Sequence, residues 1–329
     1  MTPPSNFADR LTLGMRALGH PLCVGLDPHL SLIPPLFRRG TMDRGDEQTA
    51  LAVQEFLTAV IDRVAGRVAI IKPQIAFFEQ LGWRGMKVLD ELCRHARAAD
   101  LLVLLDAKRG DIGSTAAGYA AAYLAPDAAM PMDALTINPY LGFDSIEPFA
   151  RVAGEAGRGL FVLVKTSNAG SGDLQDREID GEPLFGRVAD GLARLPEELL
   201  QPLRGAETGW SSLGVVCGAT WPEQARRVRE ALPRALFLVP GYGAQGGSAA
   251  DALRGFVPGP KGLEGGIVNS SRGILFPDLD VDSEKSGRIG TGSAGDARSS
   301  SETARWERAI DVALDRAIDE LGNAVQARR

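Results

Sequence analysis

Short apolar runs recur along the chain, and stretches of helical periodicity separate most of them. The runs are continuous rather than alternating, which is typical of parallel strands that helices cover from outside. Strands that alternate with helices at this spacing predict an α/β protein. Eight runs favour a closed (β/α)8 TIM barrel over an open sheet. The predicted strands are residues 21–27, 68–72, 101–106, 134–138, 160–165, 213–217, 235–239 and 265–269.

Three further segments complete the predicted organisation. Residues 168–183 and 276–302 are rich in Gly, Ser and Asp, so we expect long loops there. Residues 303–326 carry apolar side chains at helical spacing and predict a closing helix. We therefore expect one barrel domain over residues 1–329.

Composition limits the possible partners. The chain has 329 residues, of which 44% are hydrophobic and 24% are charged, and this is enough for a large core. A net charge of -6 argues against binding to nucleic acid or to a membrane surface, because both favour a basic protein face. A small anionic ligand needs only a few local cations and stays possible.

The cysteines and the apolar runs indicate a compartment. Cys23, Cys93 and Cys217 are far apart and form no CxxC pair, so we expect small buried side chains in a reducing environment. No apolar stretch approaches the length of a membrane span, and the first residues do not have the pattern of a signal peptide. A cytoplasmic location is expected.

Polar residues follow the predicted strands at their carboxyl ends. In barrel enzymes this end of the strands carries the active site. The residues at these positions are Asp27, Lys72, Asp106, Lys108, Asn138, Lys165, and Pro240 with Gly241.

The third strand ends in a dense group of charges, in the stretch LLVLLDAKRGD. Asp106 and Lys108 are two residues apart in an extended chain, so they share a face, and the second strand brings Lys72 beside them. A buried carboxylate between ammonium groups stays ionised, because each charge offsets the cost of burying the others. Such an array can hold a negative charge near a substrate and offer a proton from Lys108. Salt bridges at the barrel rim are the alternative, but so many charges at one place favour a functional site.

A second candidate site follows the last two strands. VPGYGAQGG follows the seventh strand and VNSSRG follows the eighth, and these two loops commonly bind phosphate in barrels. Gln245 can donate a hydrogen bond to a phosphate, and Arg272 can bind two of its oxygens. A turn beside a surface arginine is the alternative interpretation.

We expect neither a dinucleotide nor a metal. Gly241, Gly243 and Gly246 spell GxGxxG, but that fingerprint opens the first βαβ unit of a dinucleotide fold, whereas here it follows the seventh strand. No group of His, Cys, Asp or Glu has the spacing of metal ligands.

These motifs together resemble one family. LDAKRGDIGST is similar to the DxKxxD motif of orotidine 5'-phosphate decarboxylases, and further blocks of that family follow in the same order: VGLDP, IKPQIAFFE, VKTSNAGS, VPGYGAQGG and NSSRG. The resemblance covers about residues 20–275, and INPYLG is typical of the longer bacterial subgroup. It implies cofactor-independent decarboxylation of orotidine 5'-phosphate to uridine 5'-phosphate, the last step of pyrimidine synthesis.

The resemblance also implies a role for individual residues. Lys72, Asp106, Lys108 and Asp111 would form an alternating charged array, with Lys108 as the proton donor. Asp111 would enter from the partner subunit of a homodimer with shared active sites. The implied substrate contacts are Thr115 from the partner subunit, Asp27 and Lys72 at the ribose, Ser167 (or Thr166 beside it) at the pyrimidine, and Gln245 and Arg272 at the phosphate near Pro240.

Three other functions share part of this pattern. A sugar-phosphate decarboxylase or aldolase of the same barrel group shares the DxKxxD motif, but it uses a magnesium-bound enediolate and needs an acidic ligand where this chain has Lys72. A Schiff-base aldolase needs a lysine with a lowered pKa, whereas Lys108 lies among carboxylates. A non-catalytic phosphate-binding protein needs only Gln245 and Arg272, and leaves the charged array unexplained. An assay of carbon dioxide release separates that last function from catalysis.

Overall fold

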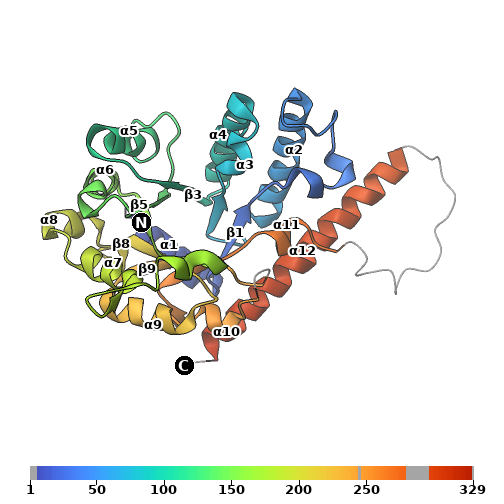
Figure 1. Ribbon diagram of the computed structural model, residues 1–329. Coiled ribbons are helices and arrows are strands. Elements are labelled where there is room, and N and C mark those ends of the chain that lie inside the picture. Colours follow the sequence, from blue (N-terminus) through green and yellow to red (C-terminus); the bar gives the residue numbers. More distant parts are fainter. Residues whose placement is uncertain (1–5, 244–245, 279–295, 328–329) are drawn as a thin grey trace.

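Eight parallel strands close into a barrel inside a layer of helices (Figure 1). The computed structural model describes residues 6–243, 246–278 and 296–327. Each of the eight predicted strands is present, and β12 pairs with β1 to close the ring, so the predicted TIM barrel is confirmed. Around the barrel the strands are β1 (Leu22–Leu26), β2 (Ile70–Pro73), β3 (Leu102–Arg109), β4 (Ala134–Ile137), β5 (Gly159–Lys165), β8 (Ser211–Cys217), β9 (Ala235–Val239) and β12 (Gly266–Ser270).

The helices surround the barrel or lie in its loops, and a β-hairpin, β10 (Val257–Gly259) with β11 (Gly262–Glu264), precedes β12. The α-helices are α1 (Phe7–Leu18), α2 (Glu47–Val64), α3 (Ala76–Glu79), α4 (Gly82–Ala98), α5 (Gly113–Tyr123), α6 (Glu147–Ala156), α7 (Leu184–Ala193), α8 (Glu197–Leu200), α9 (Pro222–Ala231), α10 (Ala249–Ala252), α11 (Arg272–Leu275) and α12 (Asp296–Gln326). The short 3-10 helices are η1 (Leu30–Leu32), η2 (Pro35–Phe37), η3 (Phe143–Ser145), η4 (Ala169–Asp173) and η5 (Gln201–Leu203).

Helix α1 packs against the amino-terminal end of the barrel. Asn6 caps this helix by accepting hydrogen bonds from the amides of Ala8 and Asp9. The ring of Phe7 is fully buried and meets that of Phe161 edge to face, with ring centroids 6.1 Å apart. Gly159 makes room for it, since a Cβ atom there would lie 2.3 Å from the Phe7 ring. The chain therefore fills this end of the barrel with side chains.

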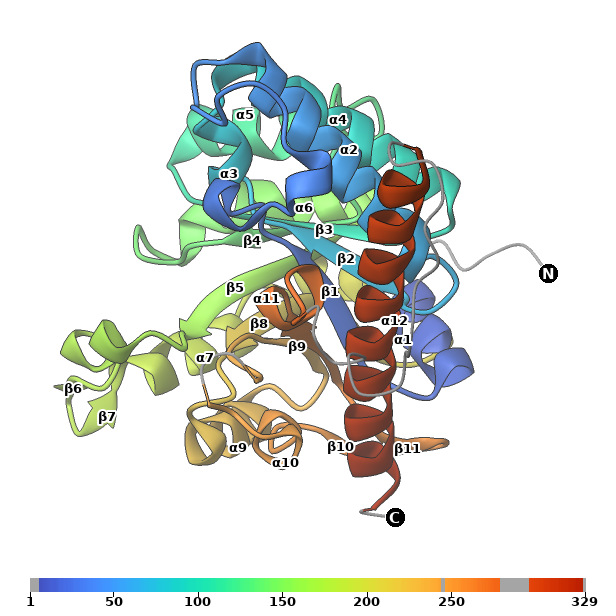
Figure 2. The same cartoon turned by 90° about the vertical axis from the view of Figure 1, so that its right-hand side faces the viewer.

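The predicted loop 168–183 contains regular structure, which corrects the prediction. It holds η4 and a small hairpin of β6 (Glu178–Ile179) and β7 (Glu182–Pro183), which projects from the barrel in Figure 2. Asp180 and Gly181 form its turn with φ of 54° and 79°, as a two-residue hairpin turn requires. Strands of two residues are too short to show an alternating pattern, so the hydrophobic pattern gave no signal.

The closing helix is also longer than predicted, because α12 begins at Asp296 rather than at residue 303. Of the predicted loop 276–302, residues 279–295 lie outside the described part of the chain. The start of the sequence of α12 is polar, and a helix without an apolar stripe leaves no periodic signal. Figure 2 shows α12 running along the outside of the barrel.

Helix α12 is attached to the barrel by aromatic packing and by ion pairs. Trp306 is buried, and its ring centroid lies 4.8 Å from that of Phe37 and 6.1 Å from that of Phe56. Asp311 forms ion pairs with Arg63 and with Arg67, at the end of α2 and just after it. The helix is thus fixed to the same side of the barrel as α2.

The cysteines agree with a further expectation. Cys23, Cys93 and Cys217 are buried and carry free thiols. None of the described helices combines the length and the apolarity that crossing a membrane requires.

Replacing Trp306 by alanine tests how strongly α12 is held. Trp306→Ala should lower the free energy of unfolding by about 3–5 kcal/mol, since it leaves a large cavity in the core. Val312→Ala on the same helix is the control, because Val312 is 48% exposed, and it should cost less than about 1 kcal/mol. Denaturant titration measures both variants, and equal losses would contradict this view of α12.

Candidate active site

A cavity of about 500 Å³ lies at the carboxyl-terminal ends of the barrel strands. Residues from β1, β2, β3, β5, β8, β9 and β12, or from the loops that follow them, contribute to its walls. Nine residues singled out in the sequence line it, namely Asp27, Lys72, Asp106, Lys108, Thr166, Ser167, Pro240, Gly241 and Arg272.

The carboxylate of Asp106 lies at the centre of the charged group. Lys72 Nζ donates to its Oδ2 at 2.8 Å, and Lys108 Nζ donates to its Oδ1 at 2.5 Å. Gln74 Nε2 and Thr136 Oγ1 each donate to it at 3.0 Å. Asp106 and Lys72 are buried, whereas the Lys108 side chain is 45% exposed. Four donors therefore fix the carboxylate, and one of them faces open space.

The charges of this group support one another. Burial alone would raise the pKa of Asp106, but Lys72 and Lys108 outweigh it and hold that pKa below the usual range of a carboxyl group. Burial likewise favours the neutral amine of Lys72, but Asp106 and Asp27 outweigh it and raise the pKa of Lys72. Asp106 and Lys72 are therefore both ionised at neutral pH.

A β-bulge places Lys108. The pairing of β3 with β4 shifts register between Leu105 and Arg109, and Lys108 has a φ of 49°, in the left-handed region. The Thr136 hydroxyl accepts hydrogen bonds from the amides of Ala107 at 2.9 Å and Lys108 at 2.8 Å. The alternation of side chains along a strand does not by itself produce this arrangement. A strained, bulky residue at the end of a strand is typical of a functional site.

Three buried polar atoms in the cavity lack a hydrogen-bond partner among the described residues. They are Asp27 Oδ1, Asn269 Oδ1 and Ser271 Oγ. A buried polar atom without a partner costs roughly 1–3 kcal/mol, which a ligand with hydroxyl groups can recover. Gly25 lets the backbone of β1 lie close to Ser271, since a Cβ atom at Gly25 would lie only 2.9 Å from Ser271 Cβ.

The predicted phosphate loops meet at the same cavity. Arg272, at the start of α11, lines it together with Pro240, Gly241 and Tyr242 after β9. This wall combines a cation with a glycine-containing backbone, which suits an anion. Gln245 lies outside the described residues.

Thr166 and Ser167 both line the cavity, but their hydroxyl groups differ. Thr166 Oγ1 donates to Asn168 Oδ1 at 2.7 Å and accepts from Gln175 Nε2 at 2.8 Å. Within the described chain the Ser167 hydroxyl has no such partner. Of the two, Ser167 is the one available to a ligand.

Lys165 does not line the cavity, although it also ends a strand. It is fully buried, and its Nζ donates to Asp176 Oδ1 at 2.7 Å and to Ser171 Oγ at 3.2 Å. Its ammonium also lies 4.3 Å from the ring centroid of Trp221. Lys165 therefore fixes the segment 168–183 in place.

Asp111 and Thr115 do not line the cavity of their own chain. The carboxylate of Asp111 accepts a hydrogen bond from the amide of Ile112 at 2.8 Å, and Thr115 is exposed on α5. Within one chain, the structure does not bring these two residues to Lys108.

Among the polar residues that the structure adds to those singled out in the sequence, four either hydrogen-bond to Asp106 or carry an unpartnered buried atom in the cavity. They are Gln74, Thr136, Asn269 and Ser271. Thr136 is the one polar residue in the otherwise apolar strand β4. A single polar side chain in an apolar strand is a sequence signal that could have indicated this residue. The other three lie inside motifs that were already noted, IKPQIAFFE and VNSSRG.

The barrel and its site define a class, that of barrel enzymes with a charged array at the strand ends and a wall with an arginine and a glycine-containing backbone in the same cavity. The chain belongs to the orotidine 5'-phosphate decarboxylase / HUMPS family, whose sequence model matches residues 20–282. This confirms the family resemblance.

Individual relatives agree. A Rhodopirellula baltica protein named orotidine 5'-phosphate decarboxylase is 45% identical over 274 residues, which is 82% of this chain and 88% of that protein. A protein of the same name from Caldicellulosiruptor bescii is 39% identical over 281 residues, covering 82% of this chain and 90% of that protein. The solved structure of Leishmania donovani OMP decarboxylase superposes with a TM-score of 0.68 at 29% identity, and the match covers 97% of this chain and 98% of that chain.

The charged centre predicts a pH-dependent stability. Asp106→Asn leaves Lys72 buried without its counter-ion, so we expect a loss of about 3 kcal/mol at pH 7. The folded pKa of Asp106 lies below the unfolded value near 4, so its contribution is present above about pH 4 and is lost as the pH falls toward the folded pKa. The difference between native and variant chains should thus be about 1 kcal/mol smaller at pH 3 than at pH 5.

Denaturant titration at pH 7, 5 and 3 measures this effect. Asp127→Asn is the control, because Asp127 is exposed, and it should stay within about 0.5 kcal/mol of the native chain. An Asp106→Asn difference that is the same at pH 3 as at pH 5 would show that the carboxylate is not stabilised by its neighbours.

Proposed function

We propose that this chain decarboxylates orotidine 5'-phosphate to uridine 5'-phosphate in pyrimidine biosynthesis, without a cofactor, and that Lys108 donates the proton. The observation that carries the proposal is Asp106, held between Lys72 and Lys108 in a cavity that Arg272 also lines. The printed names of the relatives support the same reaction.

The reaction needs a cation at the reacting carbon. The bond between ring carbon C6 and the carboxylate breaks, carbon dioxide leaves, and the electron pair stays on C6. The ammonium of Lys108 stabilises this developing charge and then transfers a proton from Nζ to C6. Solvent can restore that proton, because the Lys108 side chain is 45% exposed.

Asp106 and Lys72 keep Lys108 in place. Asp106 holds the Lys108 ammonium at 2.5 Å, and Lys72 compensates the carboxylate from the other side at 2.8 Å. Because Gln74 and Thr136 also fix Asp106, little reorganisation accompanies the reaction.

The remaining walls bind the rest of the nucleotide. Asp27 Oδ1 and Asn269 Oδ1 accept hydrogen bonds from the ribose, and the Ser271 hydroxyl donates or accepts one there. Ser167 contacts the pyrimidine. Arg272 binds the phosphate beside Pro240, with Gln245 as a further donor. Binding energy from the phosphate can then be used to position the distant ring.

Lys72 separates this function from that of a magnesium-dependent sugar-phosphate enzyme of the same barrel group. Such an enzyme needs an acidic ligand at the end of the second strand, where this chain has an ammonium paired with Asp106. A spectrophotometric assay with orotidine 5'-phosphate, with and without a chelator, tests the proposal. Turnover that the chelator leaves unchanged is expected. Binding without release of carbon dioxide, or loss of activity on chelation, would overturn it.

We also propose a homodimer in which Asp111 and Thr115 complete the partner's active site. Both lie outside the cavity of their own chain. The nearby Ile112 is 61% exposed and Tyr140 is 78% exposed, as is typical of residues at an interface.

Two further proposals concern the whole chain. The repeated strand–helix pattern supports one barrel domain over residues 1–329. The free cysteines support a cytoplasmic location.

Lys108→Ala tests the proton donor. Turnover should fall by at least about 100-fold, because a general acid contributes at least that much, while circular dichroism should show an intact fold. Lys87→Ala is the control, since Lys87 is an exposed lysine of α4, and it should keep native activity. Retention of more than about a tenth of the activity in Lys108→Ala would exclude the assigned role.

Mixing two inactive variants tests the shared site. Lys108→Ala and Asp111→Ala chains are unfolded and refolded together. In a mixed dimer, one site carries both lesions and the other is native. Random pairing restores roughly a quarter of all sites under two-fold symmetry. Activity that stays at the level of the separate variants, with mixed dimers present, would place Asp111 in its own subunit's site.

A further inference from the structure

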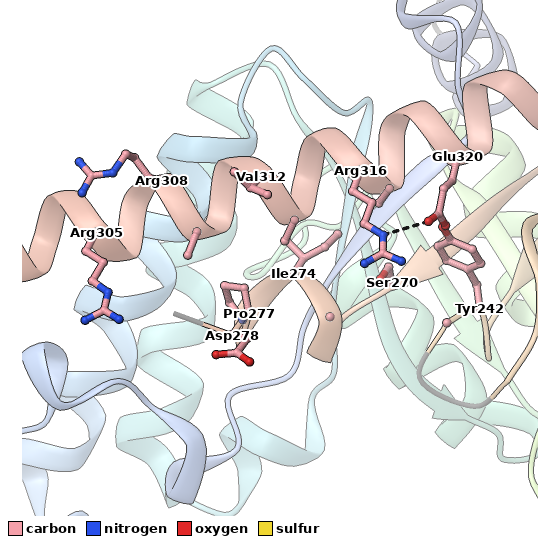
Figure 3. Close-up of a pocket in the computed structure, with 15 residues that line it drawn as sticks. Tyr242, Ser270, Ile274, Pro277, Asp278, Arg305, Arg308, Val312, Arg316 and Glu320 are labelled. Atoms are coloured by element: carbon pink, nitrogen blue, oxygen red, sulfur yellow. Dashed lines mark hydrogen bonds and ion pairs between the residues drawn. The ribbon is translucent and has the colours of Figure 1, made fainter. Parts of the chain in front are cut away.

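Tyr242 connects the phosphate wall to the closing helix. It lines the active-site cavity and also a second cavity of about 370 Å³ beside α11 and α12 (Figure 3). Its side chain is buried and extends toward Glu320 of α12. The flanking Gly241 and Gly243 have φ of 93° and 69°, so the backbone on each side is in a conformation that other residues rarely adopt.

The contact between Tyr242 and Glu320 is a short, charged hydrogen bond. Tyr242 Oη donates to Glu320 Oε2 at 2.6 Å, and Arg316 Nε donates to Glu320 Oε1 at 3.0 Å. The bonds from Tyr242 and Arg316 lower the pKa of Glu320, so its carboxylate is ionised at neutral pH. Burial and the adjacent carboxylate raise the pKa of Tyr242, so its phenol keeps its proton. A hydrogen bond to a charged acceptor is about twice as strong as a neutral one.

Helix α12 is a rigid support for this bond. Trp306 and Asp311 attach its first half to the side of α2, and Gln326 Nε2 donates to Lys261 O at 2.7 Å near its end. Leu314 and Leu321 are fully buried along the same helix. Helix α12 also lies beyond residues 20–282, the part that the family model matches, so this contact comes from outside the matched barrel.

The backbone next to Tyr242 forms part of the proposed phosphate site. Pro240, Gly241 and Tyr242 line the cavity with Arg272. Backbone hydrogen bonds hold the turn itself, since Pro240 O accepts from Ala219 N at 2.9 Å and Gly243 N donates to Gly247 O at 3.0 Å. The Tyr242 side chain adds a contact between this turn and a distant helix.

We propose that Glu320 and Tyr242 are positioning residues for the phosphate end of the substrate. Glu320 holds the Tyr242 hydroxyl, and Tyr242 in turn holds the backbone after β9 at the distance that phosphate binding requires. The inference rests on the proposed function. Neither residue touches the reacting carbon, so their loss should weaken substrate binding and leave the chemical step intact.

Steady-state kinetics of Tyr242→Phe, Glu320→Ala and the double variant test this role. Each single variant should raise KM for orotidine 5'-phosphate about tenfold, the loss expected for one hydrogen bond to a charged group, with kcat within about twofold. The double variant should match the single ones, because both remove the same bond. Glu320→Gln keeps an acceptor and should recover part of the loss. Asp319→Asn, an exposed neighbour on α12, is the control and should behave as the native chain.

Phosphate-free orotidine separates positioning from general damage to the fold. Its kcat/KM should be unchanged by Tyr242→Phe and by Glu320→Ala. An unchanged KM for the full substrate, equal losses with both substrates, or losses that multiply in the double variant would each overturn the inference. If the native chain does not decarboxylate orotidine 5'-phosphate, the proposed function fails. Titration with uridine 5'-phosphate then still decides the inference, because equal Kd values for native and Tyr242→Phe chains would overturn it.

Discussion

One carboxylate shared by two ammonium groups determines the arrangement of the rest of the site. Asp106 is buried, and a lone charge there would be neutralised or expelled. Lys72 from β2 and Lys108 from the end of β3 make its burial possible, and each of them depends on Asp106 in return. Because these residues come from adjacent strands of a closed barrel, their distances are set by backbone pairing rather than by loops. That origin explains how the group can be rigid while still presenting one ammonium to open space.

The rigidity also has a local cost, which the β-bulge in β3 shows. Lys108 adopts a left-handed φ of 49°, which is unfavourable for a lysine. The Thr136 hydroxyl offsets this strain by accepting hydrogen bonds from the backbone amides of Ala107 and Lys108. The same hydroxyl donates to Asp106, so one side chain couples backbone strain to the charged centre. Strain at this point has a functional meaning if Lys108 must reach a substrate atom, because a regular strand would direct its side chain elsewhere.

The sequence predicted the barrel well because its strands are continuous apolar runs, whose signal depends only on burial. The sequence predicted less of the site, because function there depends on the direction in which each side chain points. Lys72 and Lys165 both end strands and are both buried, yet Lys72 faces Asp106 in the cavity while Lys165 faces Asp176 in a neighbouring loop. No pattern in either strand distinguishes the two. The β6–β7 hairpin and the start of α12 escaped prediction for a related reason, since exposed elements bury too little apolar surface to leave a periodic pattern.

Different contacts fix the two ends of the cavity in place. This difference bears on how substrate binding and the chemical step would depend on separate parts of the fold. The charged centre is fixed by hydrogen bonds between adjacent strands, so few substitutions outside it can move it. The opposite wall is the backbone around Tyr242, which has a glycine on each side. The Tyr242 side chain hydrogen-bonds to Glu320 of the closing helix α12, which begins at Asp296. On the proposed function, chemistry would depend on contacts within the barrel, whereas affinity for the phosphate would depend on the closing helix as well. Such a separation would let substrate affinity change through α12 without disturbing the charged centre.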